Sequence, residues 1–129
     1  MREGVMETIE QKDENGCGIA AVAMLAGVSY DVARAVIHPS GRSKLTKTKD
    51  LHAALVKLGR MPLSERRIGF RSITHKDLDV DALIFVKMGK KGKGNGHWII
   101  WDNAARVLRD PDQTTKPFQI RGYLPVAKE

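Results

Sequence analysis

An uncharged run of eleven residues, GIAAVAMLAGV at 18–28, is the feature that most constrains how this chain can fold. The run is apolar on nearly every face of a helix, and its alanines favour helix formation. Such a helix has to be surrounded by other elements, and it is well short of the roughly 20 residues that span a bilayer. We therefore expect a buried helix over residues 17–27, ended by Gly27.

The length of 129 residues fits one domain, which we place over residues 1–129. A chain of this length can form a hydrophobic core that needs no disulfide or metal to stabilise it. Cys17 is the only cysteine, so an intrachain disulfide and a multi-cysteine metal site are excluded. We expect no cofactor and no metal. The N-terminus has no apolar run of signal-peptide length, which predicts a cytoplasmic protein without a membrane span. Export by a signal-less route, as of an effector, stays open.

Patterns further along the chain predict helices first and strands afterwards. Ser29 opens a short helix over residues 30–36, and a leucine stripe marks another helix that starts at Thr48 or Lys49 and stops before Gly59. Beyond that glycine the pattern changes to short apolar or alternating runs, which we assign to strands at 67–73, 82–86, 98–101, 105–109, and 118–120 with 123–126. This segregation predicts an α+β fold with an antiparallel sheet.

Positive charge is concentrated in the middle of the sequence. The net charge is +7, and residues 38–76 carry 10 basic and 2 acidic side chains. A block of this kind can steer an acidic protein or peptide to the surface, or it can be an ordinary solvated face. Aromatic residues make up 5% of the chain, too few for base-stacking platforms, so nucleic acid is the less favoured partner.

Cys17 stands at the start of the expected buried helix, between Gly16 and Gly18. The positive end of a helix dipole favours a thiolate at that position, and the flanking glycines let a substrate approach the backbone. A backbone N–H at the same helix start is placed to stabilise an oxyanion. The alternative, a buried structural cysteine, is the more common role of an isolated cysteine.

His97 is the candidate base that a cysteine nucleophile requires. It follows a glycine- and lysine-rich loop at 89–96 and opens an apolar strand. With a hairpin turn centred on residues 103–104, Asp110 lies opposite His97 and can fix the tautomer of its ring. A one-residue slip would reverse the face of the side chain. Two other residues therefore stay open for this role, namely Asp112 and Asn103.

Gln11 precedes Cys17 by six residues, and its side-chain amide is able to donate to an oxyanion. Taken alone, Gln11 has the character of a surface glutamine. Its interest comes from its position on the segment that leads into the expected helix.

Two stretches resemble the bacteriocin-processing peptidases, which are bacterial double-glycine leader peptidases of the papain-like superfamily. They are QKDENGCGIAAVAM at 11–24, and GHWII at 96–100 followed by RDP at 109–111. The resemblance implies a papain-like fold and a thiol protease. It further implies that Cys17 is the nucleophile, His97 the base and Asp110 its orienting residue, and that Gln11 lines the oxyanion hole.

We therefore expect a cysteine peptidase, a hydrolase that cleaves a peptide bond in a leader peptide or a target protein. The same residues could instead deamidate or cross-link glutamine side chains, as in a toxin or effector. A different class also stays open, a non-catalytic binding module that uses residues 38–76 on an acidic protein or nucleic acid. The sequence does not choose between these functions.

Overall fold

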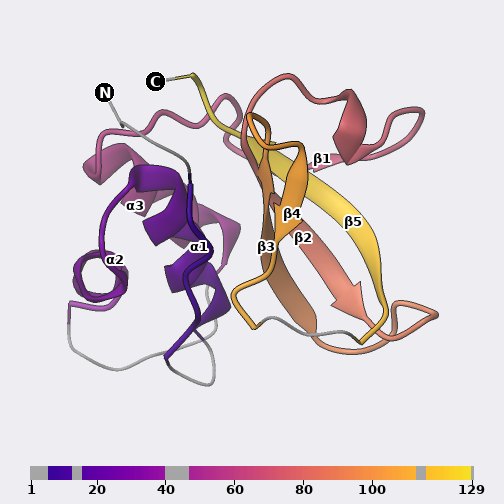
Figure 1. Ribbon diagram of the computed structural model, residues 1–129, viewed down its shortest axis with the longest axis horizontal. Coiled ribbons are helices and arrows are strands. Elements are labelled where there is room, and N and C mark those ends of the chain that lie inside the picture. The colour runs from indigo at the N-terminus through magenta and orange to yellow at the C-terminus, as the bar shows by residue number, and fades with distance from the viewer. Residues whose placement is uncertain (1–5, 13–15, 40–46, 113–115, 129) are drawn as a thin grey trace.

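The computed structural model describes residues 6–12, 16–39, 47–112 and 116–128. Within these residues three α-helices precede one five-stranded antiparallel sheet, so the expected α+β fold is confirmed (Figure 1). The helices are α1 (Cys17–Ala26), α2 (Tyr30–Ile37) and α3 (Thr48–Lys57). The strands are β1 (Ile68–Gly69), β2 (Ala82–Met88), β3 (Gly96–Asp102), β4 (Val107–Arg109) and β5 (Phe118–Pro125), and a 3-10 helix, η1, covers His75–Asp77.

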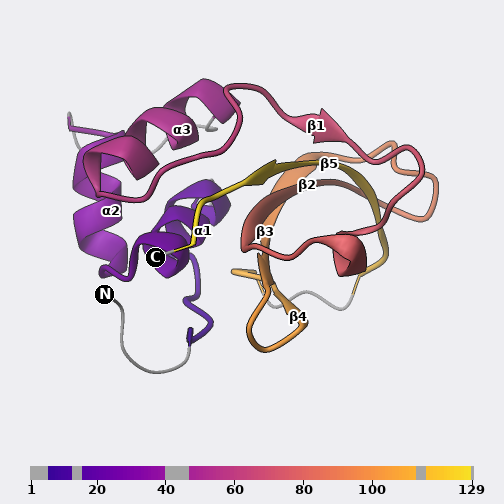
Figure 2. The same cartoon turned by 90° about the horizontal axis from the view of Figure 1, so that it is seen from above.

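α1 is the buried helix that the sequence predicts. Every residue from Gly18 to Leu25 is buried, and the helix packs against α2, α3 and β3. Figure 2 shows α1 between the other two helices and the sheet. Gly27 ends the helix in the left-handed region, at φ 70°, where glycine is favoured. Only the first residue, Cys17, is partly exposed at the beginning of the helix.

The strands run in the order β1-β5-β2-β3-β4, so the last strand lies between the first and the second. β5 is one strand, as expected, and it is continuous through residues 121 and 122, which the sequence pattern did not include. A bulge interrupts its pairing with β2, because Phe85 pairs with Gly122 while Val86 pairs with Ile120. Arg121 is thus an extra residue on β5, and such bulges redirect side chains.

The strand expected at 67–73 is confirmed only at Ile68 and Gly69, and the rest of that prediction is wrong. Only Ile68 and Gly69 pair with β5. Phe70 then leaves the ladder and stacks on Tyr123, with ring centroids 4.5 Å apart. This contact with a residue distant in sequence is not visible in the alternating pattern on which the longer strand was predicted.

Both faces of the sheet are covered by apolar side chains. Leu83, Trp98 and Ile100 join the helices in one cluster, and residues of opposite parity, including Ile84 and Ile99, form a second cluster on the other face. The continuous apolar runs of β2 and β3 are explained by this double burial.

None of the described helices is by itself long and apolar enough to cross a membrane. Among these helices, only α1 and α2 taken together have the length and apolar composition of a membrane span, and the chain bends by 114° between these two helices.

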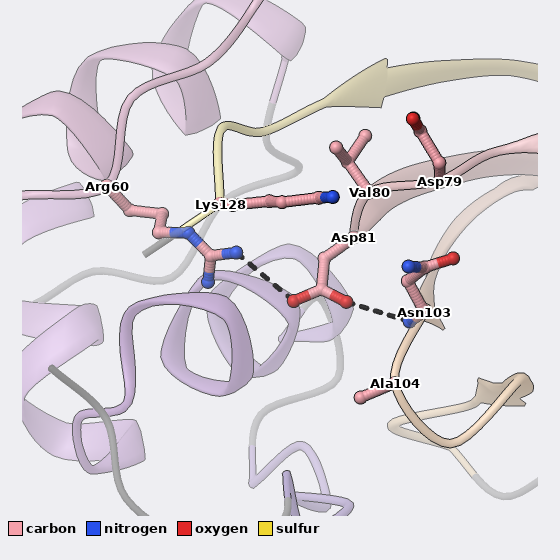
Figure 3. Close-up of a pocket in the computed structure, with 7 residues that line it drawn as sticks. All are labelled: Arg60, Asp79, Val80, Asp81, Asn103, Ala104 and Lys128. Atoms are coloured by element: carbon pink, nitrogen blue, oxygen red, sulfur yellow. Dashed lines mark hydrogen bonds and ion pairs between the residues drawn. The ribbon is translucent and has the colours of Figure 1, made fainter.

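Arg60 is the main correction to the view of residues 38–76 as one cationic face, of which 40–46 lie outside the described residues. Its side chain is 6% exposed and forms an ion pair with Asp81, with 3.1 Å between Nη2 and Oδ2. It also donates to the backbone oxygens of Leu25 and Ala127. Figure 3 shows the Arg60–Asp81 ion pair and the hydrogen bond that Asp81 accepts from the backbone N–H of Asn103 at 2.8 Å. Arg60 therefore joins the end of α1 to the sheet.

We expect Arg60→Leu to lower the free energy of unfolding by about 3 kcal/mol, because it leaves the Asp81 carboxylate without its buried cation. Urea denaturation monitored by circular dichroism measures the change. The matched control is Arg66→Leu, since Arg66 is exposed. Equal midpoints for the two variants would contradict a structural role for the Arg60–Asp81 ion pair.

Candidate active site

Three segments meet at the start of α1. They are the first residue of that helix, the beginning of β3, and the loop that follows β4. Their side chains at the meeting point are Cys17, His97 and Asp110. The His97 residue is 9% exposed, so its ring is nearly closed off from water.

The structure brings His97 and Asp110 into direct contact. The Nε2 atom of His97 lies 2.7 Å from Oδ1 of Asp110. The same oxygen accepts a hydrogen bond from the backbone N–H of Asp112 at 2.9 Å, which holds the carboxylate in place. The other two candidates for this role are engaged differently. Asp112 supplies its backbone to the site, and the side chain of Asn103 accepts from Arg106 at 2.8 Å.

The hairpin that carries both residues is shifted by two positions from the expected register. Asp102 pairs with Val107, so a four-residue loop joins the strands, and continuing the ladder would set Asp110 opposite Ile99. Asp110 is therefore diagonal to His97, where the expected hairpin centre had set the two residues roughly opposite each other. A shift of two residues keeps a side chain on the same face, and diagonal neighbours are still within reach of each other. This parity explains why the contact forms despite the different register.

Cys17 is the second partner of the His97 ring, as a side-chain hydrogen-bond partner. Because Nε2 is occupied by Asp110, the ring atom left for the sulfur is Nδ1. The imidazole thus bridges the carboxylate and the thiol. This is the order of contacts that a cysteine nucleophile, its base and the group that orients the base require.

Burial on its own lowers the pKa of His97, because it disfavours the charged ring. Hydrogen bonds and charge interactions with Asp110 and Cys17 outweigh that effect, and the pKa of His97 rises from 6.5 to about 10. The ring therefore carries a positive charge at neutral pH. The Asp110 carboxylate, 2.7 Å from the ring, is the charge partner that stabilises this buried imidazolium.

Gln11 lies beside the same loop. Its backbone N–H donates to the carbonyl oxygen of Pro111 at 3.0 Å, and its Oε1 atom is buried. The structure thus places Gln11 next to the residue that follows Asp110. Its role as an oxyanion donor stays a prediction.

The anchoring of this segment was missed by the sequence reasoning. Arg109 donates to the buried Asp102 at 2.9 Å and to Oγ1 of Thr8 at 3.2 Å. These bonds hold residues 8–11 along the hairpin. Opposite charges on the two strands were a signal for the first bond, but only the correct register makes them neighbours. Nothing in the sequence pointed to Thr8.

Comparison of the sequence with protein-family models gives no match, and comparison with curated proteins gives none either. Among the described residues, no group of three or more His, Cys, Asp or Glu side chains is placed to hold a metal ion.

The pKa of His97 provides the first test of this geometry. In a ¹⁵N NMR titration the ring should stay protonated up to about pH 10. Cys17→Ala removes two of the four interactions that raise this pKa, so it should lower the midpoint. Since the pKa is raised on folding, the stabilisation is complete below pH 6.5 and is lost as the pH rises towards 10.

His75 serves as the internal control in the same spectra. Burial, Lys76 and Arg106 lower the pKa of His75, so it should titrate below 6.5 in every variant. A wild-type midpoint for His97 at or below 6.5 would contradict its pairing with Cys17 and Asp110.

Proposed function

We propose that this chain is a papain-like cysteine peptidase, a hydrolase in which Cys17 is the nucleophile. The single observation that carries the proposal is the His97 ring held between Cys17 and the Asp110 carboxylate. A structural cysteine needs neither an imidazolium beside it nor a carboxylate that fixes the ring.

The reaction begins with attack of the Cys17 sulfur, as the thiolate, on the carbonyl carbon of the substrate. The electron pair of the carbonyl moves to its oxygen, and the oxyanion accepts hydrogen bonds from the backbone N–H of Cys17 and from the amide of Gln11. The first N–H groups of a helix have no partner inside the helix. The N-cap residue of α1 is Gly16, and no side-chain hydrogen bond caps this helix start among the described residues. The helix start is thus available to the oxyanion.

The His97 imidazolium then donates its proton to the leaving nitrogen as the C–N bond breaks. A thioester joins the acyl group to Cys17, and an amine departs. Neutral His97 next takes a proton from water, and the hydroxide attacks the thioester and releases a carboxylic acid. The Cys17 thiolate and the protonated ring are thereby restored. Asp110 stabilises the ring in its charged form throughout.

The architecture supports the same proposal. A cysteine at the beginning of a buried helix and a histidine on an antiparallel sheet are the arrangement that the resemblance to double-glycine leader peptidases implies. The structure has Cys17 as the first residue of α1 and His97 as the second residue of β3. We infer from this combination a peptide or protein substrate.

Alkylation of Cys17 by iodoacetamide tests the activated pair. We expect wild-type protein to react at neutral pH at least tenfold faster than His97→Ala, because the imidazolium stabilises the thiolate. Mass spectrometry of the intact protein measures the rate constant. The matched control is His75→Ala, since His75 lies against Trp101 and has no contact with Cys17. Equal rates for wild type and His97→Ala would refute the proposed pair.

Activity on peptides tests the reaction itself. Incubation with a diverse peptide library should yield new termini, and Cys17→Ala should abolish them while its circular dichroism stays unchanged. Removal of a nucleophile of this kind costs on the order of 10⁴-fold or more in rate. Cleavage by Cys17→Ala at the wild-type rate would contradict the mechanism. Conversion of glutamine to glutamate without cleavage would assign the same site to deamidation.

A further inference from the structure

A pocket lies on β1, β2 and β5, and none of its lining residues is Cys17, His97 or Asp110. Its volume is about 330 Å³. Its lining residues are Arg67, Ile68, Gly69, Phe85, Arg121 and Gly122.

Two guanidinium groups give this pocket its chemistry. Arg67 lies over the ring of Phe85, with its Cζ atom 4.0 Å from the ring centroid. Arg121 comes from the β5 bulge, and its Nη2 atom donates to the carbonyl oxygen of Gly92 at 3.2 Å. Both side chains are therefore held in place before any ligand arrives. A third cation, Lys87, also lies near the Phe85 ring, at 5.9 Å.

The positive charge in this pocket is not neutralised locally. Its lining includes no Asp or Glu, and within the described part of the chain neither Arg67 nor Arg121 forms an ion pair with a carboxylate. Planar guanidinium groups are suited to bind a carboxylate through paired hydrogen bonds. The pocket thus matches one acidic side chain.

The position of the pocket connects it to the candidate active site. Cys17 and Phe85 both pack against the helix-facing cluster, and the ring of Phe85 lies 5.1 Å from the ring of Trp98, its partner on β3. The pocket spans β2 and β5, which are one and two strands away from β3. Strands are about 4.8 Å apart and an extended peptide rises about 3.3 Å per residue, so the far side of the pocket, on β5 and two strands from β3, is reached by about three residues of a bound peptide.

We propose that the pocket is a substrate subsite that binds an Asp or Glu side chain about three residues from the scissile bond. The proposal rests on the proposed function, because the subsite belongs to a peptide held at Cys17. Arg67 and Arg121 bind the carboxylate, and the Phe85 ring packs against the aliphatic part of the side chain. The subsite would make this enzyme selective for an acidic segment.

Glycines keep the pocket open. A Cβ atom on Gly122 would lie 3.1 Å from the carbonyl oxygen of Ile68 and would narrow the floor. A Cβ atom on Gly69 would meet nothing within 4 Å. Gly69→Val therefore adds bulk at the pocket lining from a Cβ position that has no close contact, and it leaves the charge unchanged.

Two series of electrophilic peptides test the subsite from both directions. Peptidyl chloromethyl ketones extend from Cys17 on the N-terminal side of the scissile bond, and N-chloroacetyl peptides extend on the C-terminal side. Each series carries Asp, Asn or Lys three residues from the reactive carbon. In one series we expect the Asp reagent to alkylate Cys17 about tenfold faster than the Lys reagent.

The matched variants separate a built pocket from general charge attraction. Arg67→Glu should reverse the order of the Asp and Lys reagents, whereas Arg66→Glu, with the same change of charge on an exposed neighbour, should keep it. Gly69→Val should abolish the preference for Asp. Chloroacetamide, which has no side chain to place, should react at the same rate with all of these variants.

Equal rates for Asp and Lys reagents in both series would overturn the subsite, as would a preference that survives Arg67→Glu. Equal loss of preference in Arg66→Glu would also overturn it, because long-range attraction would then be sufficient. Failure of the proposed function has a different signature. In that case chloroacetamide would react no faster with wild type than with His97→Ala.

Discussion

The burial of α1 on all sides is the constraint on which the rest of this structure depends. A helix without a polar face has to be enclosed, and here α2, α3 and β3 enclose it. This enclosure sets β3 against the helix and brings the start of β3 to the start of α1. Cys17 and His97 are therefore neighbours as a result of the apolar packing between α1 and β3. The reactive groups stand at the edge of the same contact that stabilises the domain.

The sequence predicted the helices well because their signals are local. Ser29 caps α2, accepting from the backbone N–H of Val32 at 3.1 Å, and Gly27 ends α1. The order of the strands was beyond reach, since pairing of β5 with both β1 and β2 depends on contacts distant in sequence. The short length of β1 could not be predicted for the same reason, because the ring of Phe70 contacts the ring of Tyr123 on β5, which is distant in sequence.

The candidate site shows the same division. Residue types and their order were enough to select Cys17, His97 and Asp110. The predicted hairpin register was wrong by two residues. The His97–Asp110 contact still forms, because a shift of two residues keeps a side chain on the same face of the strand. The burial of individual basic residues was harder still to predict. Arg60 and Arg67 lie in the same basic stretch of sequence, but Arg60 is buried and Arg67 is exposed. One is enclosed by backbone oxygens and Asp81, and the other is exposed over Phe85.

The place of β5 has a consequence for the order of assembly during synthesis. β5 follows every other element in the chain, yet it lies between β1 and β2 and supplies Leu124 to the helix-facing cluster. A nascent chain that has emerged only as far as Asp110 already contains Cys17 and His97 but lacks this support. β2, the strand that pairs with β3, therefore gains its second partner only when β5 has been made.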